Sequence, residues 1–544
     1  MTLARKYRFL SDLSFLILLA SVLILSAGGH LVAFDEETMF RVTQNLVSGK
    51  GLAIGNETLV IPAQSNPLFL PSKAERIPST STAIGKGGLS YSKYAIGQSL
   101  LAIPLYFAGY LWQGLFSSIS AVELPVSASR LAVSMLNPIA LALTGWLLVL
   151  FGRALGYSVR TARWVALACV FTSFAWPYVK TFYPQPGAAF LLLAITYSAY
   201  RWRTSWNSRW LWLLSCSLAS MILVRLDTVI VLPALVLYLA LGVSPDRRWR
   251  WILPLATGLA IAGAATLAYN LLRFGSFTYT GYDEVAWNNP VVGGLYGFLF
   301  SPGKGVFVYA PLLILAVGAM VIFVKSHRAE AFLFTGLWLS FLIFYAPYNF
   351  WTGGFNWGPR FLLPVIPLGF LPLGSLLEES KSKLSVVVFS SLFILGLLVQ
   401  VPAILVDHGR FLYQQVFESS DLERYGQTIN RPDLSPALQQ WPVALRLLRA
   451  YSSRSTWNAA ERSLREIDQY ASQLDIPNAR ELLRADFFRR NTPDFWWLHG
   501  ALLASDYRPV MAIFPGVLFS IAGTAGMVFG NRRARPGSRP KGTA

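Results

Sequence analysis

The chain has 544 residues, of which 54% are hydrophobic and 13% charged, and its mean hydropathy is +0.47. Apolar runs of about 17 to 25 residues recur along it, which excludes a soluble globular protein and indicates a polytopic helical membrane protein. A formal net charge of +19 would suggest a nucleic-acid partner in a soluble protein. Here the Lys and Arg residues gather in short loops between apolar runs, so membrane topology explains the charge and no nucleic-acid partner is expected.

The first hydrophobic segment runs over about 13–33. Arg5, Lys6 and Arg8 precede it and no basic residue follows closely, so the positive-inside bias predicts a cytoplasmic N-terminus. The segment is long, its exit is acidic and no small-residue cleavage pattern follows. We therefore interpret it as a retained span and not as a signal peptide.

An acidic triplet, Asp35, Glu36 and Glu37, follows this span on the predicted non-cytoplasmic face. Carboxylates at a membrane boundary are costly to keep there, so the triplet is the strongest functional lead in the chain. The simpler alternative is that these acids cap a helix and complement its dipole. Apolar residues spaced through 36–48, with glycines after them, predict a short helix along the interface.

The first external segment is expected to extend over 34–130. Within it, residues 95–116 form an apolar stretch that is long enough to span the bilayer. A span there would put the following basic clusters on the wrong side, so the sequence favours a reclining or re-entrant helix. Pro104 and Gly109 make such a helix easier to form.

Basic clusters between the later apolar runs act as cytoplasmic anchors. One span begins near Leu131, and a hairpin of about 164–200 follows it. Threading the chain in this way predicts 12 spans with both termini in the cytoplasm. The anchoring clusters are Arg153, Arg160 and Arg163; Arg201, Arg203 and Arg209; Arg247, Arg248 and Arg250; Lys325 and Arg328; Lys381 and Lys383; and Arg532, Arg533 and Arg535.

The chain is thereby divided into three parts. Residues 1–405 form a transmembrane module, 406–507 an external helical cap, and 508–544 a last span with a basic cytoplasmic tail. In the cap, 458–474 and 478–490 are expected to be helical, with Pro442 among several prolines that break helices.

Seven cations stand nearly alone at the external ends of apolar spans, where topology does not explain them. A charge that faces the bundle interior at that depth is a functional-site hypothesis. Arg suits phosphate because its planar fork makes two parallel hydrogen bonds, whereas Lys acts as a point charge. We predict phosphate binding for five of them and membrane-surface contacts for Lys180 and Arg273. The five are Lys93, Arg130, Arg225, Lys304 and Arg360.

Each of these predictions has a structural alternative. Arg225 could be neutralised by Asp227, two residues away. Lys304 lies in a glycine-rich loop that could cradle a phosphate with backbone N–H groups or could simply be a turn.

The cysteines and histidines give no sequence evidence of a disulfide or a metal site. Cys169 and Cys216 both lie in apolar segments, so no disulfide framework or CxxC metal site is expected. His30, His408 and His499 are too scattered along the chain to define a metal site.

Several motifs occur in a consistent order and on one side of the membrane. Together they resemble the GT-C superfamily of membrane glycosyltransferases, in particular the branch of protein O-mannosyltransferases and lipid A aminoarabinose transferases. The resemblance covers about residues 1–405. The motifs are Phe34-Asp35-Glu36, Tyr91-Ser92-Lys93-Tyr94 before Gly97-Gln98, Arg130, Tyr269-Asn270 with Arg273-Phe274-Gly275 and Thr280-Gly281-Tyr282, Ser301-Pro302-Gly303-Lys304-Gly305, and the stretch WTGGFNWGPR that ends at Arg360.

The resemblance implies an all-α GT-C-like bundle that moves a sugar from a polyprenyl-phosphate carrier to an acceptor hydroxyl, with inversion at the anomeric carbon. It implies a multi-pass protein of the inner or plasma membrane, with its active site on the periplasmic or extracellular face. By this resemblance Asp35 is the general base, Glu36 helps to bind the acceptor or a metal, and the external Arg and Lys residues bind the donor phosphate.

Two departures from the family pattern matter. Related chains carry a Pro-Pro-Leu type of step where this chain has Lys93-Tyr94-Ala95-Ile96-Gly97, and often an acid where this chain has Gln185. The second departure predicts catalysis by one carboxylate. Metal dependence stays open: Mg²⁺ or Mn²⁺ would have to be held by the acidic triplet with water and the substrate phosphate.

Two other classes of protein remain as alternatives. A lipid-linked glycan ligase or polymerase would share the external arginines but would not need a carboxylate directly after the first span. A lipid or sugar transporter (flippase) predicts helix breaks near the midplane and an inverted repeat, of which the sequence gives no clear sign. Besides membrane lipids, the expected partners are a polyprenyl-phosphate sugar and a glycan, lipid or protein acceptor.

Overall fold

A computed structural model gives the fold. It describes residues 3–31, 33–55, 57–60, 75–78, 80–116, 126–241, 249–282, 286–379, 382–415, 423–474 and 478–504. The predicted last span and basic tail, 508–544, therefore lie outside the described residues, as do residues 505–507 at the end of the predicted cap.

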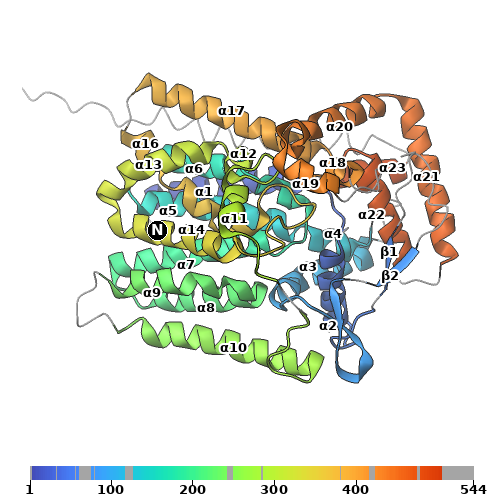
Figure 1. Ribbon diagram of the computed structural model, residues 1–544, viewed down its shortest axis with the longest axis horizontal. Coiled ribbons are helices and arrows are strands. Elements are labelled where there is room, and N and C mark those ends of the chain that lie inside the picture. Colours follow the sequence, from blue (N-terminus) through green and yellow to red (C-terminus); the bar gives the residue numbers. More distant parts are fainter. Residues whose placement is uncertain are drawn as a thin grey trace, which may run out of the picture.

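Most of the chain is a bundle of roughly parallel helices, which run horizontally in Figure 1. Its long helices are α1 (Leu3–Leu25), α5 (Leu136–Ala154), α6 (Val159–Phe171), α7 (Gln185–Ser205), α8 (Arg209–Val224), α10 (Ile252–Phe274), α13 (Leu312–Ser326), α14 (Arg328–Tyr345) and α17 (Lys383–Leu405). Shorter ones are α9 (Leu232–Ala240), α11 (Val291–Phe300), α12 (Val306–Tyr309), α15 (Ile366–Phe370) and α16 (Leu373–Glu379), with 3-10 turns at η2 (Trp176–Lys180), η3 (Leu226–Val231) and η4 (Arg360–Val365).

Five stretches of the described chain are long and apolar enough to cross a membrane, judged by length and composition: Ala128–Ala154, Ile252–Phe274, Arg328–Tyr345, Arg360–Glu379 and Lys383–Leu405. Five shorter apolar helices of 10–17 residues accompany them. The protein is thus an all-α membrane protein, as predicted, while the count of 12 spans stays a prediction.

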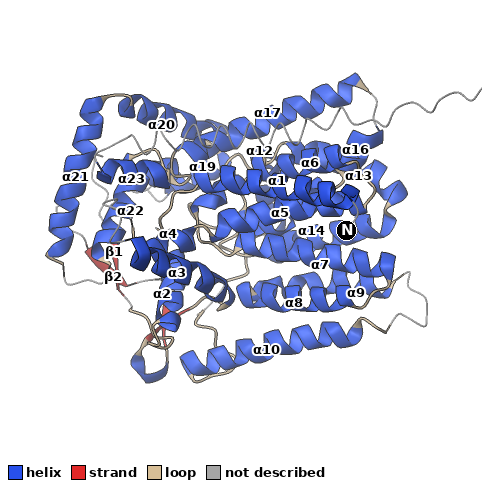
Figure 2. Ribbon diagram, turned by 180° about the vertical axis from the view of Figure 1, so that it is seen from behind, coloured by secondary structure: helices blue, strands red, loops and turns tan. Residues whose placement is uncertain are grey.

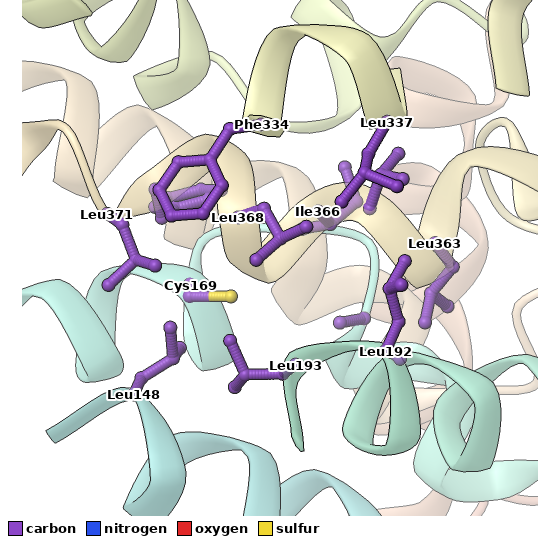
Figure 3. Close-up of a cluster of buried hydrophobic side chains, with 14 of the residues drawn as sticks. Leu148, Cys169, Leu192, Leu193, Phe334, Leu337, Leu363, Ile366, Leu368 and Leu371 are labelled. Atoms are coloured by element: carbon purple, nitrogen blue, oxygen red, sulfur yellow. The ribbon is translucent and has the colours of Figure 1, made fainter. Parts of the chain in front are cut away.

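The bundle core is built almost entirely from aliphatic and aromatic side chains. Figure 3 shows Leu148 of α5, Cys169 of α6, Leu192 of α7 and Phe334 of α14 converging on the short helices after Arg360. Cys169 is fully buried among them, which agrees with its expected place in an apolar segment. These contacts fix the segment that carries Arg360 in the centre of the bundle.

The predicted cytoplasmic loops meet at the end of the bundle that carries the N-terminus (Figure 1). Arg153 Nη1 lies 2.6 Å from Asp12 Oδ2, and Arg163 Nη2 lies 3.6 Å from Asp12 Oδ1. The basic loop after α5 is therefore beside the start of α1, as the alternation of spans requires.

The opposite end of the bundle carries α2 (Phe34–Val47), α3 (Gly97–Phe116) and α4 (Ala128–Ser134). α2 is the predicted helix after the first span, and it begins two residues earlier than expected. α3 starts on α8, where a side chain at Gly97 would meet the backbone of Leu223, and then runs against α4. Its Leu101, Tyr110 and Trp112 are exposed, an apolar surface suited to lipid.

The first external segment was expected to contain interfacial helices. It also contains two short antiparallel hairpins, which the sequence analysis did not predict. They are β1 (Glu57–Val60) with β2 (Glu75–Pro78), and β3 (Thr82–Ile84) with β4 (Ser90–Ser92). The second hairpin turns through Gly87 and Gly88, both at positive φ, and leads directly to Lys93.

The cap follows α17, which ends at Leu405, where the sequence placed the boundary. Its helices are α18 (Arg410–Tyr413), α19 (Glu423–Asn430), α20 (Pro436–Tyr451), α21 (Arg454–Ser472), α22 (Ala479–Asn491) and α23 (Trp496–Ala504). α21 and α22 correspond to the two predicted helices and share an apolar core around Leu464, Leu483 and Phe488. Pro442 does not end a helix as expected, since α20 continues through it.

In Figures 1 and 2 the cap stands at the same end of the bundle as α2 and the hairpins. Segments separated by hundreds of residues thus surround one space at this end of the bundle.

Candidate functional site

The end of the bundle that carries α2 and the cap holds a cavity of about 1020 Å³. Its walls come from both the transmembrane module and the cap. They are the start of α2, residues 93–96, the loop 180–185, the end of α8 with η3, the end of α10, the end of α14, the loop 350–361, residues 407–413, and α22.

Asp35 sits in the first turn of α2, and its side chain is 27% exposed to the cavity. The Ser81 hydroxyl donates to Asp35 Oδ1 at 2.9 Å, and the Tyr94 hydroxyl donates to Ser81 Oγ at 3.1 Å. Burial, and next the charge of Asp35, raise the pKa of Tyr94 well above its usual range, so this hydroxyl stays protonated. One oxygen of Asp35 is oriented in this way, and Oδ2 faces the nearest guanidinium.

Glu36 lines the cavity but is only 3% exposed. Its Oε2 accepts from the Ala33 N–H at 3.2 Å, and its Oε1 accepts from the Phe182 N–H at 2.8 Å. The first contact satisfies an unpaired amide at the start of α2, and the second ties α2 to the loop after η2. These contacts favour a positioning role for Glu36 over direct catalysis.

Glu37 points away from Asp35 and is paired with two arginines. Arg41 Nε lies 2.9 Å from Oε1, and Arg130 donates to both carboxylate oxygens from Nη1 and Nη2. Burial raises the pKa of Glu37, but the two arginines, Arg130 above all, outweigh it and lower that pKa below its usual value. Glu37 is therefore a buried anion with structural partners.

Arg130, which was predicted to bind the donor phosphate, does not line the cavity. Its side chain is 1% exposed, its Nε donates to Glu481 of the cap at 2.7 Å, and its other nitrogens hold Glu37. Each guanidinium nitrogen thus donates to a carboxylate, which favours a structural role, and phosphate binding by Arg130 stays a prediction.

Arg360 fits the phosphate prediction best. It enters the cavity from η4, and its Nη1 lies 3.9 Å from Asp35 Oδ2. Its Nε is buried and has no hydrogen-bond partner among the described residues. The rings of Tyr183 and Phe361 lie 5.3 Å and 5.0 Å from its guanidinium and fix its plane. A buried guanidinium with unused donors is a site prepared for an anion.

Arg225 forms the predicted pair with Asp227 and also lines the cavity. It follows α8, where the backbone turns extended, and it pairs with Asp227 through Nε at 3.1 Å and through Nη2. Nη2 also donates to the Tyr345 hydroxyl at 2.8 Å. The internal pair is therefore real. Arg225 still lines the cavity, and Nη1 is the nitrogen left for a ligand.

Lys93 is half-buried and lines the cavity directly after the second hairpin. Within the described part of the chain its ammonium makes no hydrogen bond or ion pair, so its charge is available to a ligand. Arg273, for which a membrane-surface contact was the expectation, lines the same cavity. Its Nη2 donates to Asn270 at 2.7 Å, and Nη1 holds the Ser92 carbonyl immediately before Lys93.

Lys304 also lies away from the cavity. Its ammonium donates to the carbonyls of Gly354, at 2.8 Å, and of Asn356, and it does not line the cavity. The glycine-rich loop packs on the cap, where a side chain at Gly303 would meet the Thr428 carbonyl. These contacts favour the turn over the phosphate cradle, and phosphate binding by Lys304 stays a prediction. Burial, together with the charge of Arg360, lowers the pKa of Lys304 well below its usual value.

The histidines are less scattered than the sequence suggested. His30 Nε2 lies 2.7 Å from Asp494 Oδ1, and His499 Nε2 lies 3.9 Å from the same oxygen. These three residues are the one group among the described residues whose ligand atoms lie close enough to hold a metal ion. Lys180 Nζ, however, lies 3.2 Å from Asp494 Oδ2 and already supplies the positive charge that this carboxylate needs. The group therefore fits a buried ion pair better than a metal site.

The acidic triplet does not converge on a metal either. Glu36 and Glu37 direct their oxygens to backbone amides and arginines. Of the three carboxylates, that of Asp35 is the most exposed to the cavity, with side chains 27% exposed for Asp35 and 6% for Glu37, and 3% for Glu36 as a whole residue.

The cap contributes residues that the sequence did not single out. Arg489 and Arg490 line the cavity from the end of α22, 4.7 Å and 4.5 Å from the ring of Tyr413. Both pair with Asp486, Arg490 at 3.0 Å and Arg489 at 3.4 Å. In the sequence they look like basic residues that complement the C-terminal dipole of a helix, so nothing marked them as site residues.

One wall of the cavity is apolar. Leu226, Val229 and Trp287 line it and are 41%, 39% and 43% exposed on the outside of the bundle. Phe344 of α14 packs edge-to-face against Trp287 with ring centroids 4.7 Å apart. The charged end of the cavity, around Asp35 and Arg360, is therefore continuous with an apolar surface at the level of the spans.

No family model matches this sequence, and no curated protein matches it. Among solved structures, the chain is similar to the crystal structure of ArnT from Cupriavidus metallidurans bound to undecaprenyl phosphate. The two are 13% identical, the alignment covers 93% of this chain and 78% of that chain, and the TM-score is 0.45.

Proposed function

We propose that this protein is an integral membrane glycosyltransferase that transfers a sugar from a polyprenyl-phosphate donor to an acceptor hydroxyl on the non-cytoplasmic face. The observation that carries the proposal is the pairing of one oriented carboxylate with unused cations. Asp35 is held by Ser81, and Arg360 lies 3.9 Å from its other oxygen in the same cavity. The order of motifs in the sequence supports the same reading.

The reaction is a single displacement. The acceptor oxygen forms a bond to the anomeric carbon while the bond from that carbon to the phosphate oxygen breaks. Asp35 takes the hydroxyl proton, and the polyprenyl phosphate leaves with the electron pair. Attack on the face opposite the leaving group inverts the anomeric carbon.

The leaving phosphate needs positive charge in a site that excludes water. Arg360, Lys93 and the free Nη1 of Arg225 supply it in this proposal, since each lines the cavity and has donors not used elsewhere in the described residues. The apolar wall at Leu226, Val229 and Trp287 suits the first isoprene units of the carrier. A metal is not required by this arrangement, and a divalent cation would have to share Asp35 with the donor phosphate.

The test is transfer of radiolabelled sugar from a panel of polyprenyl-phosphate sugars by the purified protein in lipid. The wild type is compared with Asp35→Asn, with and without EDTA. Carrier-dependent transfer that falls by about 100-fold or more in Asp35→Asn supports the transferase and its base. Normal transfer by the variant would remove Asp35 from the mechanism. Absence of transfer from every donor would favour the ligase or transporter alternatives.

A further inference from the structure

We propose that the cap positions the catalytic carboxylate, with Arg130, Glu481 and Asp494 as its positioning residues. The proposal rests on the proposed function only in naming Asp35 as the base. It assigns a role to the cap, residues 406–507, whose sequence indicates no role.

The first link runs from the cap to the start of α2 through one buried arginine. Glu481 of α22 accepts from Arg130 Nε at 2.7 Å and from the Ser127 N–H at 2.7 Å. Arg130 then holds Glu37, two residues beyond Asp35, and stacks on Phe40 with its guanidinium 4.3 Å from the ring centre. The arginine is 1% exposed, so its charge must be compensated within the protein, and Glu37 and Glu481 both contact it.

The second link reaches the chain on the other side of Asp35. Asp494 accepts from His30 at 2.7 Å and pairs with Lys180 at 3.2 Å. Both partners of Asp494 are nearly fully buried, with side chains 2% exposed for His30 and 1% exposed for Lys180. Burial raises the pKa of Asp494, but Lys180 and His30 outweigh it and hold that pKa well below its usual value.

The backbone around Asp494 strengthens this link. The last carbonyls of α1 have no partner within the helix. The indoles of Trp496 and Trp497 donate to Ile24 and Leu25 at 2.9 Å each, and the Trp496 N–H donates to Ala27 at 3.1 Å. The cap thereby closes the end of the first span.

These two links bracket the acid. His30 and Glu37 are seven residues apart, and Asp35 lies between them, so the cap fixes the chain on both sides of the base. The cations assigned to the donor phosphate, Lys93, Arg225 and Arg360, come from the transmembrane module instead. Loosening the cap should therefore reduce turnover and leave donor-phosphate binding in place.

The experiment uses the full-length protein in lipid and three measurements: binding of undecaprenyl phosphate, sugar transfer, and hydrogen exchange of residues 34–47. In Glu481→Ala we expect the Kd for undecaprenyl phosphate to stay within two-fold, kcat to fall by about ten-fold, and exchange of 34–47 to accelerate. Asp494→Asn, which weakens the second link, should act in the same direction. Glu481→Gln keeps one acceptor oxygen, so its kcat and its exchange of 34–47 should lie between those of the wild type and of Glu481→Ala.

The matched control is Asp433→Ala, which removes the partner of the exposed Arg431, 2.6 Å away, within the cap itself. It should change kcat less than two-fold. Unchanged exchange of 34–47 and unchanged kcat in both Glu481→Ala and Asp494→Asn would overturn the proposal, as would equal effects of Asp433→Ala. If the wild type transfers no sugar, the transferase assignment fails, while the exchange of 34–47 still decides whether the cap holds α2.

Discussion

Arg360 Nη1 and Asp35 Oδ2 face each other across the cavity at 3.9 Å. The gap is longer than a hydrogen bond, so the two groups attract one another without a direct donor–acceptor contact. A ligand oxygen can enter between them, since Arg360 Nε is unused and Asp35 is already held through its other oxygen by Ser81. Proton acceptor and phosphate partner are thus adjacent but not bound to each other.

Replacing Arg360 tests the phosphate contact. Arg360→Gln should raise the donor KM and the Kd for undecaprenyl phosphate by about 10- to 100-fold, because a charge-assisted hydrogen bond contributes about 1.5–3 kcal/mol. Arg360→Lys should recover part of the affinity. Arg431 is an exposed arginine of the cap, with its side chain 56% accessible. Arg431→Gln therefore serves as the control and should leave the donor KM and the Kd for undecaprenyl phosphate unchanged. Equal affinities for Arg360→Gln and wild type would show that the phosphate binds elsewhere.

Gly353 offers a geometric test of the same residue. It has φ of +70°, and a Cβ there would lie 2.7 Å from Arg360 Nε. Gly353→Ala should therefore displace the guanidinium and weaken undecaprenyl phosphate binding. Gly87→Ala carries the same backbone strain at φ of +71°, of about 1 kcal/mol, with no atom within 4 Å of the added carbon. The Kd for undecaprenyl phosphate, measured for Gly353→Ala and Gly87→Ala, separates the effect of backbone strain from the effect of displacing the guanidinium. Equal Kd values for the two variants would contradict the prediction.

Ser81→Ala removes the hydrogen bond that orients Asp35. We expect kcat to fall by about five-fold, the equivalent of one hydrogen bond of about 1 kcal/mol, with donor KM unchanged. Tyr94→Phe, one step further along the chain of hydroxyls, should have a smaller effect. Ser452→Ala, at an exposed cap position, is the control for a lost hydroxyl. A rise in KM with constant kcat would assign Ser81 to donor binding instead.

Comparing Glu36→Gln with Asp35→Asn distinguishes the structural role proposed for Glu36 from the catalytic role proposed for Asp35. Because Glu36 accepts from two backbone amides, the substitution should lower the free energy of unfolding by about 1–2 kcal/mol and reduce kcat less than ten-fold. Asp35→Asn should show the opposite pattern, with a large loss of kcat and little loss of stability. Thermal unfolding and transfer rates of both variants, measured side by side, check this. A loss of kcat in Glu36→Gln as large as in Asp35→Asn would restore its catalytic role.

Acid should loosen the cap through His499. Burial, opposed by Asp494, lowers the pKa of this imidazole to about 3, with His30 and Lys180 also disfavouring its charge. An unfolded histidine takes up a proton near pH 6.5, so below that pH the unfolded state binds more protons and stability falls. By pH 5.5 the loss is about 1.4 kcal/mol. Hydrogen exchange of α22 and α23 at pH 7.5 and 5.5 measures it. His499→Gln, which does not titrate, should flatten the pH dependence, and an unchanged slope would contradict the assignment.

The sequence alone determined the helical membrane architecture, the helix after the first span, the two long cap helices, and the acid and cations worth examining. Those follow from local patterns: apolar runs, the sidedness of basic loops, and charges that interrupt apolar segments. Asp35, Lys93, Arg225 and Arg360 were all found in this way, and all four line one cavity.

Only the tertiary structure decided which charges remain available to a ligand. Arg130 and Lys304 have the same signature in the sequence as Arg360, yet one is occupied by Glu37 and Glu481 and the other by loop carbonyls. Glu481 lies 351 residues from Arg130, so no local pattern could reveal the pair. A buried charge must find a partner wherever the fold brings one, and that partner determines whether the residue is structural or free to bind.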